Sequence, residues 1–244
     1  MTSGVQIVFG LGEVGSAIQS VLRAGGHTVY GVDPWKAIDE LPDGDLDVQA
    51  IHICFPYSSS FVREITAYED IFRPDLVIVH STVKPGTCDP HGWVHSPVQG
   101  KHPRLAESMT RFDKWFGGRR ADQAAVLFEG ADVFAQVFPD ALTCELAKVL
   151  DTTRYGWEIV WVKEVAAICK AYGVDVVDVH DLWTYNYNAG YRDLGYSDFT
   201  RSVLNPVPGP IGGHCVMPNL ELLGDWPVTI IINSFNDIYE GESA

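Results

Sequence analysis

The strongest constraint on the fold of this chain is the glycine-rich sequence Gly10-Leu11-Gly12-Glu13-Val14-Gly15. An apolar run, Val5–Phe9, precedes it, and the segment Glu13–Ala24 carries apolar residues at helical spacing, so the pattern predicts a strand, a tight turn and a helix. In such a unit the first glycine permits the turn, the second lets a pyrophosphate approach the backbone, and the third lets helix and strand pack closely. The sequence therefore predicts a Rossmann unit that binds a dinucleotide.

A carboxylate follows the second predicted strand. The run Thr28–Val32 ends at Asp33, about twenty residues after the turn, where the acidic residue of an NAD site accepts hydrogen bonds from the adenosine ribose. Asp33 would repel a 2′-phosphate and no Arg follows it, so the sequence favours NAD over NADP. A Rossmann-like fold that binds another ligand is the alternative. The predicted NAD contacts in this part of the chain are Gly10, Gly12, Glu13, Val14, Gly15 and Asp33.

Apolar runs alternate with helical segments through the first part of the chain. Two further strands are predicted at Ala50–Phe55 and Leu76–His80, with a helix at Ser58–Phe72 between them. This alternation is typical of parallel βαβ units. A strand at Trp93–Val98 and a helix at Ala121–Phe128 would extend the sheet to five or six strands. The predicted fold class is α/β, a doubly wound parallel Rossmann sheet followed by a smaller, mainly helical domain.

One long helix marks the change of character. From Asp140 as N-cap to Gly173 as the residue after the helix, the chain contains no proline. At roughly 1.5 Å per residue such a helix is about 48 Å long, so we expect it to bridge domains or line a dimer interface. The predicted domains are 1–140, which binds NAD, and 141–244, which is helical.

The remainder contains a shorter helix, a loop and an apolar run. A second helix is expected at Asp175–Tyr187, directly after the long one. The segment Asn205–Asn219 is rich in glycine and proline and predicts a shaped loop. By propensity alone, the β-branched run Val228–Ile232 predicts a strand.

Composition narrows the possible partners. The formal net charge is −15, which disfavours nucleic acid and anionic membrane surfaces. No apolar run approaches the roughly 18–20 residues of a membrane span, and no secretory signal is visible. The five cysteines form no CxxC pair and are odd in number, which suits a reducing compartment. We expect a soluble cytoplasmic protein whose partner is a small-molecule substrate.

Two side chains have the chemistry of catalysis, although each has an ordinary structural interpretation. Cys215 follows two glycines, and a thiolate in a rigid turn is a competent nucleophile toward an aldehyde. A loop cysteine that merely packs is the alternative. Lys148 within the long helix is either a solvated lysine or, near a cofactor, a group that stabilises an alkoxide.

Together these motifs resemble the UDP-glucose/GDP-mannose dehydrogenase family. The resemblance extends over nearly the whole chain, in order and in rough spacing. It rests on GLGEVG and Asp33, on Ser81-Thr82-Val83-Lys84-Pro85-Gly86-Thr87, on Glu145-Leu146-Ala147-Lys148 and on Gly212-Gly213-His214-Cys215.

The resemblance implies a site and a reaction. Enzymes of this family use NAD twice to oxidise the C6 alcohol of a nucleotide sugar, through a thiohemiacetal and a thioester on the loop cysteine. By motif, Cys215 would be the nucleophile, Lys148 would stabilise the oxyanion, and Thr82 would lie beside the nicotinamide and a catalytic water. Further NAD contacts would be Phe55, Pro56, Ser81 and Thr82. The resemblance also implies a homodimer through the long helix, and a helix at Thr229–Tyr239.

Three polar positions depart from the family pattern. Thr152 stands where the family usually has Asn, Asn219 where it has Asp, and Val98 where it has the Glu that assists thioester hydrolysis. The loop before Cys215 also exchanges glycine and proline positions. In addition, the family continues beyond the position of Ala244 into a second Rossmann-like domain, so the chain is similar to a short form. Thr152 and Asn219 are nevertheless candidate catalytic residues.

Histidines near the strand at Trp93–Val98 invite a metal site. Cys88, His91 and His95 have no second ligand cluster to complete one, so no metal is predicted. His95 or His102 is instead a candidate to replace the carboxylate that Val98 lacks. Speculative substrate contacts are Lys101, His102 and His214.

The leading functional hypothesis is an NAD-dependent dehydrogenase that oxidises an alcohol of a sugar-like or nucleotide-sugar substrate. One alternative is a two-electron hydroxyacid dehydrogenase related to the 6-phosphogluconate dehydrogenase superfamily, in which Cys215 is structural. The other is a non-catalytic NAD-binding protein.

Overall fold

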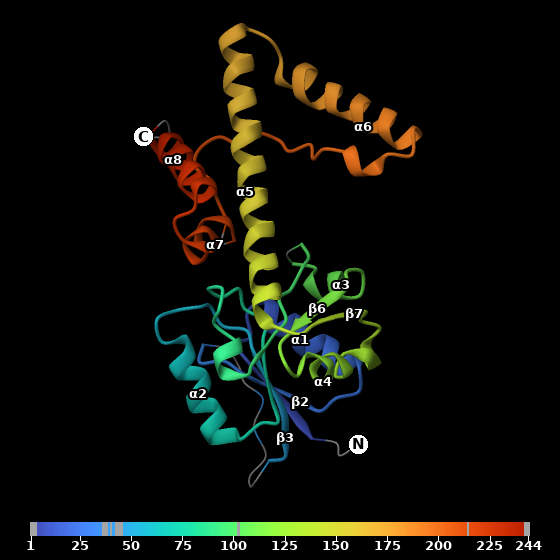
Figure 1. Cartoon of the computed structure of the whole chain (residues 1–244), viewed down its shortest axis with the longest axis vertical. Helices are drawn as coiled ribbons and strands as arrows, with labels where there is room; N and C mark the ends of the chain where they lie inside the picture. Colours follow the sequence, from blue (N-terminus) through green and yellow to red (C-terminus); the bar gives the residue numbers. More distant parts are fainter. Residues whose placement is uncertain are drawn as a thin grey trace. The chain divides into compact units, whose positions relative to one another are not determined.

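The computed structural model divides the chain into two units, Met1–Lys148 and Val149–Ala244 (Figure 1). It describes residues 4–35, 39, 41, 46–101, 103–213 and 215–241. The first unit is an α/β layer structure and the second is helical. Each unit is described by itself below.

A seven-stranded sheet forms the centre of the first unit. Its strand order is β2-β1-β3-β4-β5-β6-β7, and all neighbours are parallel except β5 and β6. The expectation of five or six strands was therefore too low. The last two strands have only four residues each, one begins with a lysine and the other is mostly exposed, so neither contains a long apolar run. The strands are β1 Val5–Phe9, β2 Val29–Val32, β3 Val48–Ile53, β4 Leu76–Val79, β5 Val94–His95, β6 Lys114–Gly117 and β7 Ala135–Phe138.

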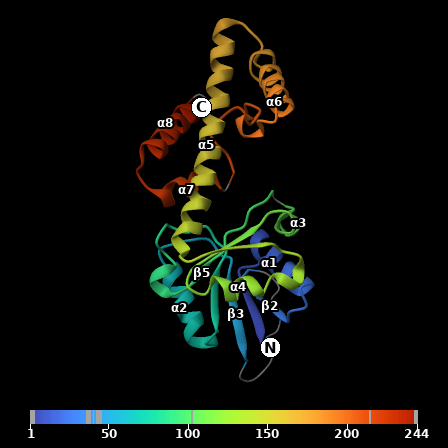
Figure 2. The same cartoon turned by 45° about the vertical axis from the view of Figure 1, so that its right-hand side comes forward.

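Helices cover both faces of this sheet. In Figure 2, α2 (Phe61–Phe72) lies on one face, and α1 (Glu13–Ala24) and α4 (Ala121–Val126) lie on the other, with the short α3 (Leu105–Met109) near α1. Alternate residues of the central strands β1, β3 and β4 enter two separate apolar cores. Ile7 and Phe9 pack toward α2, whereas Val8 packs toward α1 and α4. Burial of both faces explains why the central strands read as continuous apolar runs.

The long predicted helix is α5, Ala141–Tyr172. Asp140 caps its N-terminus, because the backbone N–H of Thr143 donates to Asp140 Oδ1 at 2.7 Å. Gly173 follows the helix with φ +69°, a conformation that favours glycine. The helix begins in the first unit and supplies the first element of the second.

The second unit adds α6, α7 and α8 to α5. α7 (Val216–Leu223) and α8 (Pro227–Gly241) lie along one side of α5, and α6 (Trp183–Asp193) lies on the other (Figure 1). The helix expected at Asp175–Tyr187 is instead a π-helical turn, η3 (Val177–Leu182), that continues into α6.

The strand expected from propensity at Val228–Ile232 is wrong. These residues belong to α8, as the family resemblance implied. Ile232, Asn236 and Tyr239 form one buried helical stripe, so packing of an amphipathic face overrides β propensity. No helix of the described residues has the length and apolarity needed to cross a membrane.

Candidate active site

The three glycines of the turn after β1 serve different purposes. Gly10 has φ +88°, and a Cβ on it would lie 2.9 Å from the backbone nitrogen of Phe55. A Cβ on Gly15 would lie 1.8 Å from the carbonyl oxygen of Gly10. Gly12, the N-cap of α1, has φ −66°, and a Cβ on it would meet nothing within 4 Å. The fold therefore requires Gly10 and Gly15, whereas the space beside Gly12 is open to a ligand.

A cavity of about 370 Å³ opens at this end of α1. Because α1 is a helix of 12 residues, its free N–H groups and dipole favour an anion at the N-terminus. Of the other predicted contacts, Glu13 is exposed and Val14 is half-buried. The cavity is lined by Gly12, Glu13, Ser16, Ala17, Ser20, Pro103 and Ala106.

Asp33 lies at the end of β2, directly against the glycine-rich turn. Its Oδ2 accepts a hydrogen bond of 2.6 Å from the backbone N–H of Leu11, and its Oδ1 accepts one of 2.8 Å from the backbone N–H of Trp35. These two hydrogen bonds orient the Asp33 carboxylate at the turn. Its position fits recognition of a ribose that lies over the turn.

Ser81, which follows β4, is hydrogen-bonded to the segment that follows β3. Its hydroxyl donates to the carbonyl oxygen of Phe55 at 2.6 Å, and Phe55 and Pro56 lie in the segment after β3. Thr82, the next residue, is half-buried. The structure therefore brings four predicted cofactor contacts, Phe55, Pro56, Ser81 and Thr82, to one edge of the sheet.

Glu145 anchors the loop that follows Thr82. This fully buried carboxylate accepts hydrogen bonds of 2.6 Å from the N–H of Gly86 and 2.8 Å from the N–H of Cys88. Asp89 of the same loop accepts from the N–H groups of Ala141 and Leu142 at the start of α5. Sequence reasoning quoted Glu145 only as part of a motif and missed this role. The available signal was an acidic residue in the second turn of α5, the helix that begins three residues after β7.

Lys148 lies one helical turn after Glu145. Its Nζ donates to the carbonyl oxygen of Val98 at 2.9 Å. Val98 belongs to the segment after β5, so this ammonium group is held at the carboxyl edge of the sheet. An ammonium group has three donors arranged around its nitrogen, and the contact with Val98 orients one of them.

Sequence reasoning also missed Lys114, the first residue of β6. It is only 3% exposed, and its Nζ donates to the carbonyl oxygen of Ser96 at 3.0 Å. Lys114 and Lys148 thus bind carbonyls of one short segment, 96–98. A single charged residue before the apolar residues of β6 was the available signal, but a solvated strand end is the more common origin of such a pattern.

In the second unit, Cys215 is exposed and is the N-cap of α7. The family-variant pair is joined by a hydrogen bond, since Asn219 Nδ2 donates to Thr152 Oγ1 at 3.1 Å. The hydroxyl of Thr152 in turn donates to the carbonyl of Val149. Thr152 of α5 and Asn219 of α7 therefore form a neutral buried pair, and Asn219 lies one helical turn after Cys215.

Two side chains, Lys163 and Asn236, anchor the loop before Cys215. Lys163 of α5 donates to the carbonyl oxygens of Val207 and Gly209, the second at 2.6 Å. The N–H of Ile211 donates to Asn236 Oδ1 of α8 at 2.6 Å. Neither anchor was predicted, because each joins residues far apart in the sequence.

His95 lies in the core of the first unit. Its ring is fully buried, and Nε2 lies 3.1 Å from the carbonyl oxygen of Ser81. Burial lowers the pKa of His95 to about 3, which makes the imidazole a weak base. Replacement by His95 of the carboxylate absent at Val98 stays a prediction.

The remaining candidates are on the surface or outside the described residues. Lys101 is exposed, and His102 and His214 lie outside the described residues. Within the part of the chain that the structure describes, no group of three or more His, Cys, Asp or Glu side chains is arranged to hold a metal ion.

The chain is similar to known proteins in sequence and in fold. No protein-family model matches the chain. In sequence it is 24% identical over 265 aligned positions to UDP-N-acetyl-D-mannosamine dehydrogenase of Methanocaldococcus jannaschii, covering 86% of this chain. The chain spans 58% of the length of that curated relative.

Among solved structures, UDP-D-ManNAc dehydrogenase from Pyrococcus horikoshii has a TM-score of 0.77 at 18% identity, covering 98% of this chain and 70% of that one. The chain has the fold of the nucleotide-sugar dehydrogenases. The fold extends to shorter enzymes, since 3-hydroxyisobutyrate dehydrogenase from Mycobacterium tuberculosis matches with a TM-score of 0.68 at 18% identity, covering 99% of this chain and 94% of that one.

Proposed function

We propose that the chain is an NAD-dependent dehydrogenase that oxidises an alcohol group of a sugar-like or nucleotide-sugar substrate. The observation that carries this proposal is the open space at Gly12. Neither the backbone conformation nor internal packing requires a glycine at this position. It lies at the N-terminus of α1, beside Asp33. A diphosphate at Gly12 and a ribose at Asp33 fit this arrangement.

Binding is tested with NADH and the full chain. We expect a saturable fluorescence change with NADH, and much weaker binding of NADPH, because Asp33 would repel a 2′-phosphate. Replacing Asp33 by asparagine should narrow the difference between the two nucleotides. The absence of saturable binding of either nucleotide would refute the proposal.

The bound cofactor would accept a hydride from the substrate carbinol carbon. Lys148 would stabilise the developing negative charge on the carbinol oxygen, and the hydrogen bond that orients its ammonium group toward Val98 supports this role. Ser81 and the Glu145-anchored loop hold Thr82 at the same edge. In this proposal, Lys148→Met lowers kcat by about two orders of magnitude or more while NADH binding is kept.

Cys215 is the proposed nucleophile for a second oxidation. Its sulfur would form a bond to the aldehyde carbon while the thiol proton passes to the carbonyl oxygen, which gives a thiohemiacetal. A second NAD⁺, exchanged for the first NADH, would accept a hydride from that carbon as the hydroxyl loses its proton, and water would hydrolyse the resulting thioester to the acid and the free thiol. The exposure of Cys215 at the N-terminus of α7 supports access to a substrate. An adduct on Cys215 in mass spectrometry, and loss of the acid product in Cys215→Ser, are the expected results.

The pair formed by Thr152 and Asn219 favours a second candidate function. Both side chains are neutral and bonded to each other, so neither is a carboxylate that could activate water for thioester hydrolysis. A two-electron alcohol or hydroxyacid dehydrogenase, with Cys215 structural, would need no such base. Product analysis separates the two reactions, since four-electron oxidation yields two NADH per acid formed and two-electron oxidation yields one NADH per aldehyde or ketone.

A third possibility is a non-catalytic role. Tight NAD binding without turnover of any alcohol would support it.

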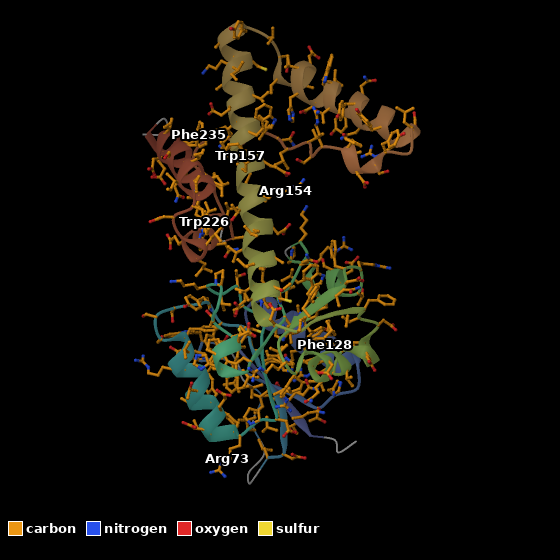
Figure 3. The ribbon with its side chains drawn as sticks, viewed as in Figure 1. Arg73, Phe128, Arg154, Trp157, Trp226 and Phe235 are labelled. Atoms are coloured by element: carbon orange, nitrogen blue, oxygen red, sulfur yellow. The ribbon has the colours of Figure 1, made fainter. Side chains whose placement is uncertain are left out.

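We also propose a homodimer through α5. Trp157 and Trp161 lie one turn apart on this helix and are 43% and 59% exposed, and Trp157 is labelled in Figure 3. Ile168 and Tyr172 repeat the spacing and are also exposed. Exposed aromatic residues in contiguous patches are typical of interfaces. Sedimentation analysis should give a dimer for the chain and a monomer for Trp161→Glu.

The proposed setting is the cytoplasm, with a small-molecule substrate as the partner. All five cysteines are free, which favours a reducing compartment.

A further inference from the structure

A chain of buried polar side chains crosses the first unit beneath the carboxyl edge of the sheet. Gln6 of β1, His52 of β3, His80 after β4 and Lys114 of β6 are each at most 3% exposed. His52 Nε2 lies 2.7 Å from the Gln6 amide, and His52 Nδ1 lies 3.0 Å from His80 Nε2. His80 Nδ1 lies 2.7 Å from the carbonyl oxygen of Ser96, to which Lys114 also donates. None of these four side chains belongs to the proposed catalytic set.

The hydrogen bonds determine where the protons lie. A carbonyl oxygen only accepts, so His80 Nδ1 carries the hydrogen that faces Ser96. Burial keeps both imidazoles neutral, because it lowers the pKa of His52 to about 3 and that of His80 well below its ordinary value. With His80 neutral, its Nε2 accepts from His52 Nδ1. His52 Nε2, which lies 2.7 Å from Gln6 Oε1, then accepts from the Gln6 amide when its oxygen and nitrogen are exchanged, an assignment that also gives a partner to the amide nitrogen.

Lys114 is the member of this network whose charge can change near neutral pH. Its Nζ contacts the carbonyls of Ser96 and Pro97 and lies 5.5 Å from the ring centres of Phe116 and Phe128, the latter labelled in Figure 3. Among the described residues, no carboxylate lies within ion-pair distance of this ammonium group. Burial lowers the pKa of Lys114 to about 7, and the charge of Lys148 contributes.

The two thiols that face this network stay protonated from pH 6 to 8.5. Burial raises the pKa of the Cys54 thiol on β3, and it raises that of the Cys144 thiol on α5 to about 12. The charge of His27, in the turn before β2, acts on His52. The groups that face Lys114 and its histidine neighbours are thus Cys54, Cys144, Lys148, His27, His52, His80 and His95.

The topology of the sheet relates Lys114 to the proposed cofactor. In an open α/β sheet a dinucleotide lies across the point where the strand order reverses, here between β1 and β3. Asp33 at the end of β2 would take the adenosine half, so the nicotinamide half would extend over the ends of β3, β4 and β5. Lys114 lies directly under that region, since it binds the carbonyls of Ser96 and Pro97 that follow β5.

We propose that Lys114 makes the chain discriminate between the oxidised and reduced cofactor: its positive charge, buried under segment 96–98, disfavours the cationic nicotinamide of NAD⁺ relative to the neutral ring of NADH. The inference rests on the proposed NAD site. NAD⁺ binding then releases a proton from Lys114, and NADH binding does not. Acid conditions consequently favour retention of NADH, whereas alkaline conditions favour exchange for NAD⁺.

Calorimetric titration of the full chain with NAD⁺ and with NADH tests this. The ratio of the NAD⁺ to the NADH dissociation constant should be about tenfold higher near pH 6 than near pH 8.5, the effect of a like charge within about 10 Å at an effective dielectric constant of about 20. In Lys114→Met the ratio should be the same at both pH values. Lys114→Arg, which stays charged, should keep the high ratio throughout.

A measurement on the unaltered chain keeps the test valid if the variants fail to fold. Near pH 7, titrations in two buffers of different ionisation enthalpy should show proton release with NAD⁺ and none with NADH. Saturable binding with a pH-independent ratio, or equal proton release with both nucleotides, would overturn the role of Lys114 alone. Failure of both nucleotides to bind at any pH would overturn the proposed NAD site itself.

Discussion

Replacing Lys114 by methionine tests whether the buried ammonium group lowers the stability of the first unit. The pKa of Lys114 falls from the ordinary 10.5 to about 7 because the side chain is buried. At about 1.4 kcal/mol per pKa unit, the charged form costs the folded chain about 5 kcal/mol relative to an exposed lysine. Methionine has a similar length and no charge, so it removes this cost.

The sign of the pH dependence follows from proton binding. Between about pH 7 and 10.5 the unfolded chain holds a proton on Lys114 that the folded chain has lost, so this group makes the free energy of unfolding rise with pH. The full cost is present below about pH 7 and disappears above 10.5. The substitution loses hydrogen bonds to the carbonyls of Ser96 and Pro97, which offset the gain by about 1 kcal/mol each.

We therefore expect Lys114→Met to be more stable by about 2–4 kcal/mol near pH 6 to 7, with the gain shrinking by about 2–3 kcal/mol at pH 9. Urea denaturation followed by circular dichroism at these pH values measures the difference. Lys101→Met is the matched control, since Lys101 is exposed and its replacement should change the stability by no more than about 0.5 kcal/mol. A variant less stable than the parent at pH 6, or a difference independent of pH, would refute the argument.

Three further predictions concern the same unit. Gly12→Ala should leave the urea midpoint unchanged but weaken NADH binding by about tenfold or more. Gly15→Ala should instead destabilise the fold, because its Cβ would lie 1.8 Å from a backbone oxygen. Equal effects of both substitutions on stability would contradict the different purposes given to these two glycines. Glu145→Gln should lower the free energy of unfolding by about 2–4 kcal/mol. The two carboxylate oxygens each accept from one loop N–H group, whereas glutamine replaces one of these oxygens by a nitrogen that can only donate. Unchanged urea denaturation would exclude the anchoring role. Burial lowers the pKa of His52 and His95 to about 3 and that of His80 well below its ordinary value. As pH falls below 6.5, the unfolded chain therefore binds protons on these histidines that the folded chain does not bind, so stability should fall by up to about 1.4 kcal/mol per pH unit for each histidine. His52→Gln should reduce that slope by about a third, and urea denaturation at several pH values measures it; an unchanged slope would contradict the prediction.

Local pattern was sufficient for the elements that carry the proposed cofactor site. β1, the glycine-rich turn and α1 follow from residues adjacent in sequence, and each glycine has the spacing that a strand–turn–helix unit needs. The same holds for α5, where Asp140 and Gly173 mark both ends. In α8, local preference and packing disagree, and propensity predicted a strand. The segment is a helix because that conformation buries Ile232 and Tyr239 in one apolar cluster.

The sequence by itself determined the Rossmann unit and the position of Asp33, because these depend on short motifs with a mechanical reason for each residue, and it led to the prediction of Lys148 and Cys215 as reactive side chains. Only the tertiary structure decided which polar groups meet. The pairing of Thr152 with Asn219 and the contacts of Lys114 join residues on different strands and helices. Their partners are set by strand order and register, which bring together side chains that no local pattern relates.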